Sequence, residues 1–539
     1  MLLNRRLAEE LSDALQQRRV SDGIELLERS EAEILQIGPD TPDSAQLLLL
    51  LAQWVDLGYR DYRFLDALLA RFQSACRKRF SVEEYLQLRM AEAFRSLASG
   101  ESGACIEALE LILKSLQELG EASNLALAHF WKGRAHRKRG EYEISLAHII
   151  RAREIAQAQN DLIFTAVIQV QESWLLFQKG MTREALQILS SAESILKTTD
   201  HYVAMGNIES ARGRIVRRRG EYTKALEHFM RAIELIARRD ASHLNLARSL
   251  VNAAYVRRLL ALQMRKRIDR RAQSGRARPG TAKSDNGESL RLRYHEMSLR
   301  ALEDLKRARE IYELHGNGDG IGKVLLNLGY LHLDRGDVDK ASPEAAEAYR
   351  IGQEQEDRIL MARARILEAA IENAHVEEQT GEDVDMAVHA HRAREFSEEA
   401  LELAHDTQNL RLLAGACIAR GITAANDFFQ DWEEARQRAS EATRLIGPGD
   451  NDHLVEDLSV LKSRIVAASG IHDTLRNWSE GMLGNKTFQQ VSEEFAEIVI
   501  PKVWMREGRK ISRVAARLSI SPKKVRRILR NAGSIGPGF

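Results

Sequence analysis

The segment GRIVRRRGEYTKALEHFMRA, residues 213–232, has the pattern of two amphipathic helices joined by a tight turn. Gly220 marks the turn, because glycine adopts the backbone conformations that end helices without a steric penalty. Ala225 follows five places later, where a small side chain lets two helices approach closely. The segment therefore predicts a helical hairpin whose two helices meet at Gly213 and Ala225.

The same pattern recurs along the chain with a spacing of about 40 residues. Residues 133–152 (GRAHRKRGEYEISLAHIIRA) and 174–192 (WLLFQKGMTREALQILSSA) repeat it, and the three turn glycines are 40 residues apart. Earlier turns are predicted at Gly100, Gly58 and Arg18, with Cys105 and Gly23 in two of the small positions. One hairpin cannot bury its apolar face alone, so we expect the repeats to stack into an all-α solenoid of about ten hairpins over residues 1–483.

One stretch interrupts the repeats. Residues 265–289, RKRIDRRAQSGRARPGTAKSDNGES, are basic, contain glycine, serine and proline, and lack apolar periodicity. The composition predicts a disordered basic insertion between two helices.

The repeat resembles the tetratricopeptide repeat family. The residues that carry the resemblance are Gly213, Gly220, Tyr222, Ala225, Phe229 and Ala232. The period of about 40 departs from the family's 34 and is similar to that of repeats in some large bacterial transcription regulators. The resemblance implies a superhelix that binds a protein or peptide partner.

A different module is predicted at the end of the chain, residues 484–539. Within it, KISRVAARLSISPKKVRRILRNAGSI, residues 510–535, has the pattern of two short helices and a turn. Ile511, Val514 and Leu518 share one apolar face with Ala515. Ser521 and Pro522 are an N-cap residue and a residue suited to the first helical position. The pattern predicts a helix-turn-helix whose second helix enters the major groove of DNA.

Charge supports this interpretation. Residues 502–539 contain eleven Lys or Arg and one acid, a net charge of +10, whereas the whole chain carries +1. Such a concentration of cations suits double-stranded DNA, whose phosphates release counterions when they are neutralised. The residues predicted to contact DNA are Lys523, Lys524, Arg526, Arg527 and Arg530 on the second helix, Ser521 at its start, and Arg509, Lys510, Arg513 and Arg517 along the phosphates.

Residues 490–533 resemble the Fis-type helix-turn-helix of bacterial enhancer-binding activators. The matching residues are Val514-Ala515-Ala516, Leu518-Ser519-Ile520-Ser521, Val525 and Leu529, with Ser519 in the place of the usual glycine. The ATPase domain that usually precedes this module is absent, so the resemblance implies DNA binding alone. One module covers a half-site, and a homodimer is therefore expected.

No catalytic arrangement emerges from the sequence, and we expect neither an enzyme nor a cofactor or metal. Three cysteines far apart in sequence, and no secretory signal or membrane span, favour a cytoplasmic location. The sequence thus predicts a DNA-binding transcriptional regulator. The alternative is a non-enzymatic scaffold whose basic C-terminal module docks an acidic protein or RNA.

Overall fold

A computed structural model describes residues 2–119, 122–275, 285–378, 383–468, 478, 481 and 486–531. These residues form helices and connecting turns, with no strand among them, which confirms the predicted all-α class. The chain divides into two compact units, Met1–Ser459 and Val460–Phe539. None of the described helices is long and apolar enough to cross a membrane.

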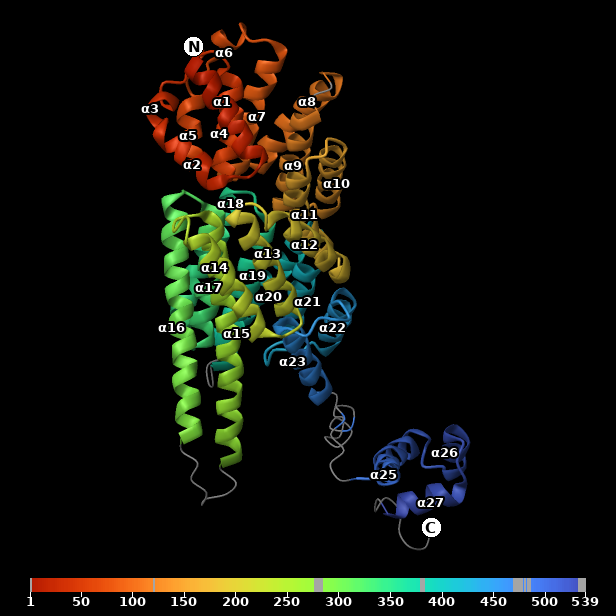
Figure 1. Cartoon of the computed structure of the whole chain (residues 1–539). Coiled ribbons are helices and arrows are strands. Elements are labelled where there is room, and N and C mark those ends of the chain that lie inside the picture. Colours follow the sequence, from red (N-terminus) through yellow and green to blue (C-terminus); the bar gives the residue numbers. More distant parts are fainter. Residues whose placement is uncertain are drawn as a thin grey trace. The chain divides into compact units, whose positions relative to one another are not determined.

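Six helices open the first unit (Figure 1). They are α1 (Leu2–Gln16), α2 (Val20–Arg29), α3 (Glu31–Ile34), α4 (Ser44–Asp56), α5 (Tyr62–Leu69) and α6 (Ser74–Arg77). Gly23 of α2 meets the fully buried Trp54 of α4, where an added Cβ would lie 1.9 Å from the indole ring. The small position predicted at Gly23 is therefore a real close approach of two helices.

The rest of the first unit is a series of helical hairpins followed by the start of α23 (His453–Ala468), within which the boundary between the units falls. The pairs are α7 (Val82–Ser99) with α8 (Ser102–Leu119), α9 (Ala122–Lys138) with α10 (Tyr142–Ala158), α11 (Leu162–Gln178) with α12 (Thr182–Leu196), α13 (Tyr202–Arg218) with α14 (Tyr222–Ala237), α15 (Leu244–Gly275) with α16 (Asp285–Leu314), α17 (Gly318–Asp334) with α18 (Val338–Glu354), α19 (Arg358–Glu378) with α20 (Asp383–His405), and α21 (Leu410–Ala424) with α22 (Trp432–Leu445). With the pairs α1–α2 and α4–α5, the described part of the chain holds the ten or so hairpins of a tetratricopeptide-type solenoid.

The hairpins form for the reasons that the sequence predicts. Gly140, Gly180 and Gly220 end the first helix of their pairs with φ of 81°, 82° and 78°, a region that favours glycine. The paired helices touch at small residues: the Ser145 hydroxyl donates to the Gly133 carbonyl at 2.7 Å. A Cβ on Gly213 would lie 2.9 Å from the buried Phe229 ring. Small residues thus set the spacing within each repeat.

The first helices of successive hairpins also pack on one another. Contacts join α11 to α13, α13 to α15, α15 to α17, α17 to α19, and α19 to α21. We call this row of first helices the inner layer. The unit winds tightly enough for distant loops to touch, since the Gln408 amide donates to the Gly140 carbonyl at 3.2 Å and the Asn451 amide to the Arg218 carbonyl at 2.9 Å.

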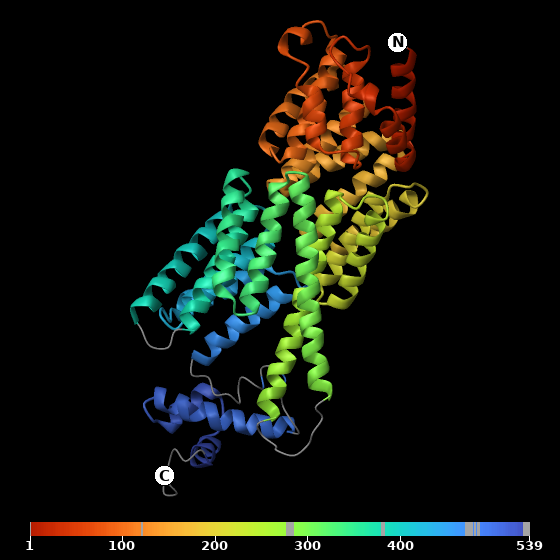
Figure 2. The same ribbon diagram turned by 90° about the vertical axis from the view of Figure 1, so that its left-hand side faces the viewer.

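The predicted disordered insertion is wrong at both of its ends. α15 continues to Gly275 and α16 begins at Asp285, so residues 265–275 and 285–289 are helical. Figures 1 and 2 show these two helices running side by side past the neighbouring pairs. Lysine, arginine, glutamine and alanine are good helix formers, and Lys266 pairs with Glu456 at 2.6 Å. Residues 276–284 lie outside the described part of the chain.

Three helices form the described part of the C-terminal unit beyond residue 486: α25 (Phe488–Arg506), α26 (Ile511–Leu518) and α27 (Pro522–Asn531). A small core joins them, made of Ile500, Val514, Ala515, Val525, Ile528 and Leu529. The predicted boundary at 484 stays a prediction, because residues 482–485 lie outside the described part of the chain.

Candidate functional site

The turn between α26 and α27 fixes how α27 is presented. Ser519 adopts a left-handed conformation with φ of 51°, in the position where the sequence pattern usually has glycine. The Ser521 hydroxyl accepts a hydrogen bond from the Lys524 amide at 3.2 Å and so caps α27. Val525 and Leu529, both fully buried, then hold one face of α27 against the core. Ser521 therefore has a structural role that its prediction as a DNA contact did not include.

The opposite face of α27 is basic. Its ten residues contain five cations and no acid. All five are exposed, namely Lys523, Lys524, Arg526, Arg527 and Arg530. The helix thus presents the predicted cations together on the surface and keeps its apolar residues inside. Such a helix offers point charges and guanidinium forks to phosphate or base edges.

The cations before α27 divide into two kinds. Arg509, Lys510 and Arg513 are exposed, and the Arg509 guanidinium lies 5.9 Å from the centre of the Trp504 ring. Arg517 instead forms an ion pair with Glu507. A phosphate would have to compete with this carboxylate, so Arg517 is the weakest of the predicted phosphate contacts.

A second basic cluster, which was not predicted from the sequence, lies on first helices of the hairpins in the first unit. We call it the inner arginine cluster. Its members are Arg137 on α9, Arg214 and Arg217 on α13, Arg248 on α15 and Arg363 on α19. Within the described residues, none of the five guanidinium groups has an ion pair or a hydrogen-bond partner.

Aromatic rings support two members of the cluster. The Arg137 guanidinium lies 5.1 Å from the centre of the Trp174 ring, and that of Arg217 lies 4.8 Å from the Tyr255 ring. Tyr142 packs edge-on against Trp174 at 5.3 Å. These rings hold the cations in place through cation–π attraction without neutralising their charge.

The electrostatics of the cluster are unfavourable in the absence of an anion. Burial lowers the pKa of Arg137 and that of Arg214 to about 9, and the charge of Arg248 lowers both further. Burial also lowers the pKa of Arg217, and the charges of Arg411 and Arg363 lower it further, in that order. These guanidinium groups therefore lie near enough to repel one another.

Other arginines on the same helices show what a structural arginine looks like in this protein. Arg134 donates to Asp56 through both terminal nitrogens, one of them at 2.9 Å. Arg258 donates to Asp334 at 2.5 and 2.9 Å. Each of these cations has a carboxylate of its own, unlike the members of the inner arginine cluster.

A signal for the cluster was present in the sequence. GRAHRKRG at 133–140 and GRIVRRRG at 213–220 place basic residues at the same repeat positions, so that Arg134 corresponds to Arg214 and Arg137 to Arg217. Repeat consensus positions explain the glycines but do not require these arginines. Which of them is paired depends on Asp56, far away in sequence, and only the fold reveals that.

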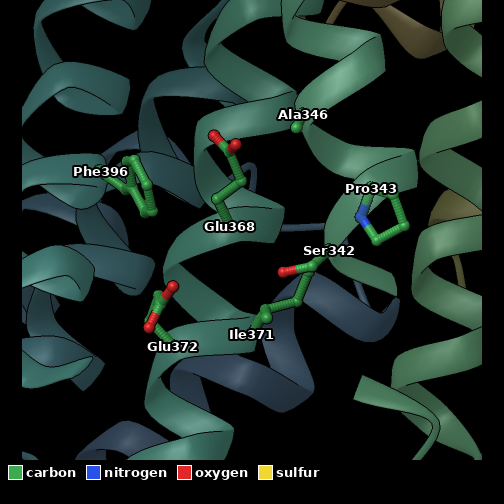
Figure 3. A pocket seen from close by; sticks show the side chains of 7 residues that line it. All are labelled: Ser342, Pro343, Ala346, Glu368, Ile371, Glu372 and Phe396. Atoms are coloured by element: carbon green, nitrogen blue, oxygen red, sulfur yellow. The ribbon is translucent and has the colours of Figure 1, made fainter. Parts of the chain in front are cut away.

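A small pocket of about 250 Å³ lies between α18, α19 and α20. Figure 3 shows Glu368 and Glu372 of α19 on one side of it with Phe396, and Ser342 and Pro343 on the other. Glu372 already bonds His389 at 2.5 Å, and Glu368 accepts from Arg365 at 2.8 Å. Its acids have partners and its volume is small for a ligand site. Among the described residues no group of three or more His, Cys, Asp or Glu is arranged to hold a metal ion.

Comparisons with known proteins give likenesses of low score. No protein-family model matches the chain, and no curated protein matches it. A Rap protein complexed with competence and sporulation factor aligns at a TM-score of 0.49 and 12% identity, over 74% of this chain and 99% of that one. The apo quorum sensor NprR from B. thuringiensis aligns at 0.38 and 14%, over 82% and 98%. A human IFIT1 dimer with m7Gppp-AAAA aligns at 0.39 and 14%, over 81% and 88%. The solenoid assignment rests on the repeat geometry above.

Proposed function

We propose that this protein is a DNA-binding transcriptional regulator without catalytic activity, in which α27 enters the major groove and the solenoid receives a protein or peptide partner. The observation that carries the proposal is the surface of α27, with five exposed cations opposite a buried apolar face. Self-repulsion among these charges is relieved when the unit meets a polyanion. Arg509, Lys510 and Arg513 supply further cations along the same unit.

The Fis-type resemblance in residues 490–533 favours duplex DNA over RNA or an acidic protein as the polyanion. An α-helix fits the major groove of B-DNA but not the deep, narrow major groove of A-form RNA. A single α27 reads one half-site, so the functional form is a dimer on a two-fold symmetric site.

A matched pair of variants of the full chain tests the proposal. Lys523→Gln with Arg527→Gln removes two charges from α27, whereas Lys502→Gln with Arg506→Gln removes two exposed charges from α25. Binding to a fluorescent 30-base-pair duplex is measured by anisotropy at low salt. We expect the α27 variant to lose at least about ten-fold in affinity, because each such contact contributes about 1–3 kcal/mol, and the α25 variant to lose much less.

Equal losses in the two variants would show that α27 has no special place at the DNA. A chain that binds single-stranded RNA or an acidic protein but no duplex DNA would favour the scaffold alternative.

A further inference from the structure

The inner arginine cluster has the features of an anion-binding site. Its members come from α9, α13, α15 and α19, which lie far apart in sequence. α13 contacts α15, and the charge of Arg248 on α15 lowers the pKa of both Arg137 on α9 and Arg214 on α13. Arg137, Arg214 and Arg217 are partly buried, whereas Arg248 and Arg363 are exposed. A cation that is shielded from solvent normally has a partner, because an unpaired buried charge is costly. The Nε atoms of Arg137, Arg214 and Arg217 are shielded from solvent and have no hydrogen-bond partner.

Stability of the fold does not explain why these arginines lack partners. Arg134, at the repeat position that corresponds to Arg214, binds Asp56 with two nitrogens. The repeat can therefore satisfy an arginine at this position when stability requires it. Arg214 has no such partner, and its neighbours Arg137 and Arg248 add repulsion. An anion supplied from outside would remove that cost.

We propose that the inner arginine cluster binds the carboxylates of an acidic peptide segment, with Arg137 and Arg214 as the principal ligands and Arg217, Arg248 and Arg363 around them. The proposal rests on the proposed role of the solenoid as the receptor of a protein or peptide, and it names the chemistry of that partner. Guanidinium forks match carboxylates with two parallel hydrogen bonds.

Two observations favour a peptide over a nucleic acid. Arg137 and Arg217 already lie over one face of the Trp174 and Tyr255 rings, which leaves less aromatic surface for base stacking. Carboxylates also lie near the cluster. The charge of Asp319 partly offsets the lowering of the pKa of Arg137, and the charge of Asp452 does the same for Arg217. A uniform polyanion would be repelled there, whereas a peptide with a few acids can avoid them.

The test measures binding of fluorescein-labelled hexaglutamate to the full chain by anisotropy. Arg137→Gln with Arg214→Gln removes two unpaired cations from the cluster. The matched control, Arg139→Gln with Arg219→Gln, removes two exposed cations two and five residues further along the same chain segments. Hexaglutamate can also bind the basic C-terminal unit, so its affinity for the Lys523→Gln with Arg527→Gln variant is measured as well.

We expect the cluster variant to lose about ten-fold or more in affinity for hexaglutamate, because charged hydrogen bonds of this kind are among the strongest in proteins. The affinity of the Arg139/Arg219 control for hexaglutamate should stay within about two-fold of that of the unmodified chain. The α27 variant loses charges from a second hexaglutamate site only, so it should lose at most part of the binding. Circular dichroism and the melting temperature of the cluster variant should match those of the unmodified chain, since no ion pair is removed.

Equal affinity of the cluster variant and the unmodified chain would overturn the proposal. So would a single-stranded oligouridine that binds and depends on the cluster while hexaglutamate does not. Binding of inorganic phosphate that depends on the cluster, with no binding of hexaglutamate, would also overturn it. The two proposals can fail separately. If the chain binds hexaglutamate through the cluster but does not bind duplex DNA, the peptide site is supported and the DNA-binding function is refuted.

Discussion

Arg134 and Arg214 occupy corresponding repeat positions and should respond oppositely to the same substitution. Arg134→Met leaves the carboxylate of Asp56 without its partner; the side chains of both residues are about one quarter exposed, at 23% and 26%. Breaking a fully buried pair costs about 3–5 kcal/mol and an exposed pair about 0–1 kcal/mol. Arg134→Met is therefore expected to lower the free energy of unfolding by about 2 kcal/mol.

Arg214→Met removes a cation that has no partner and is repelled by Arg137 and Arg248. Its stability should stay the same or rise by about 1 kcal/mol, as when buried charges are replaced by apolar groups of similar volume. Differential scanning fluorimetry of the two full-length variants measures the difference. At about 2.1 cal/mol/K of unfolding entropy per residue, the unit Met1–Ser459 gives about 1 °C per kcal/mol, so Arg134→Met should lower the melting temperature by about 2 °C. An equal fall for Arg214→Met would refute the interpretation of the cluster as unpaired.

Two further predictions concern single residues. Ser519→Gly should stabilise the C-terminal unit by about 1 kcal/mol, because it removes the strain of a non-glycine residue in the left-handed region at φ of 51°. Slower hydrogen exchange in α26 and α27 would show this stabilisation, and faster exchange would contradict it. Burial lowers the pKa of His129 to about 4 and of His148 to about 3, so between pH 6.5 and 4 the unfolded chain binds protons that the folded chain does not. The melting temperature should fall as pH drops through that range, and His148→Gln should make the fall shallower; an unchanged slope would show that His148 does not contribute.

The repeat architecture could be predicted from the sequence because it depends on local signals. Turn glycines and small residues recur at a fixed spacing, and both have geometric consequences within one hairpin. The spacing alone predicted a turn at Arg18 and a small position at Gly23, where no tetratricopeptide pattern is visible. The contact between Gly23 and Trp54 explains why the residue at position 23 is small. The same reasoning missed the continuation of α15 and α16, because basic residues without apolar periodicity can be either helical or disordered.

The candidate sites divide in the same way. The cations of α27 follow from helix periodicity, which places Lys523 and Arg527 opposite Val525 and Leu529. The inner arginine cluster depends on which carboxylates the fold brings to each arginine. Arg214 and Arg134 look alike in sequence, and only the position of Asp56 distinguishes them.

The salt dependence of DNA binding by the full chain shows whether the cations of α27 contact DNA phosphates. Affinity for a 30-base-pair duplex is measured from about 50 to 200 mM salt, where log K should fall linearly with log salt by about 0.9 per phosphate contact. With the five cations of α27 engaged, the slope should be about −4 or steeper, and Lys523→Gln with Arg527→Gln should flatten it by about 2. Absence of binding at about 50 mM salt, or a slope that the α27 variant leaves unchanged, would contradict the account.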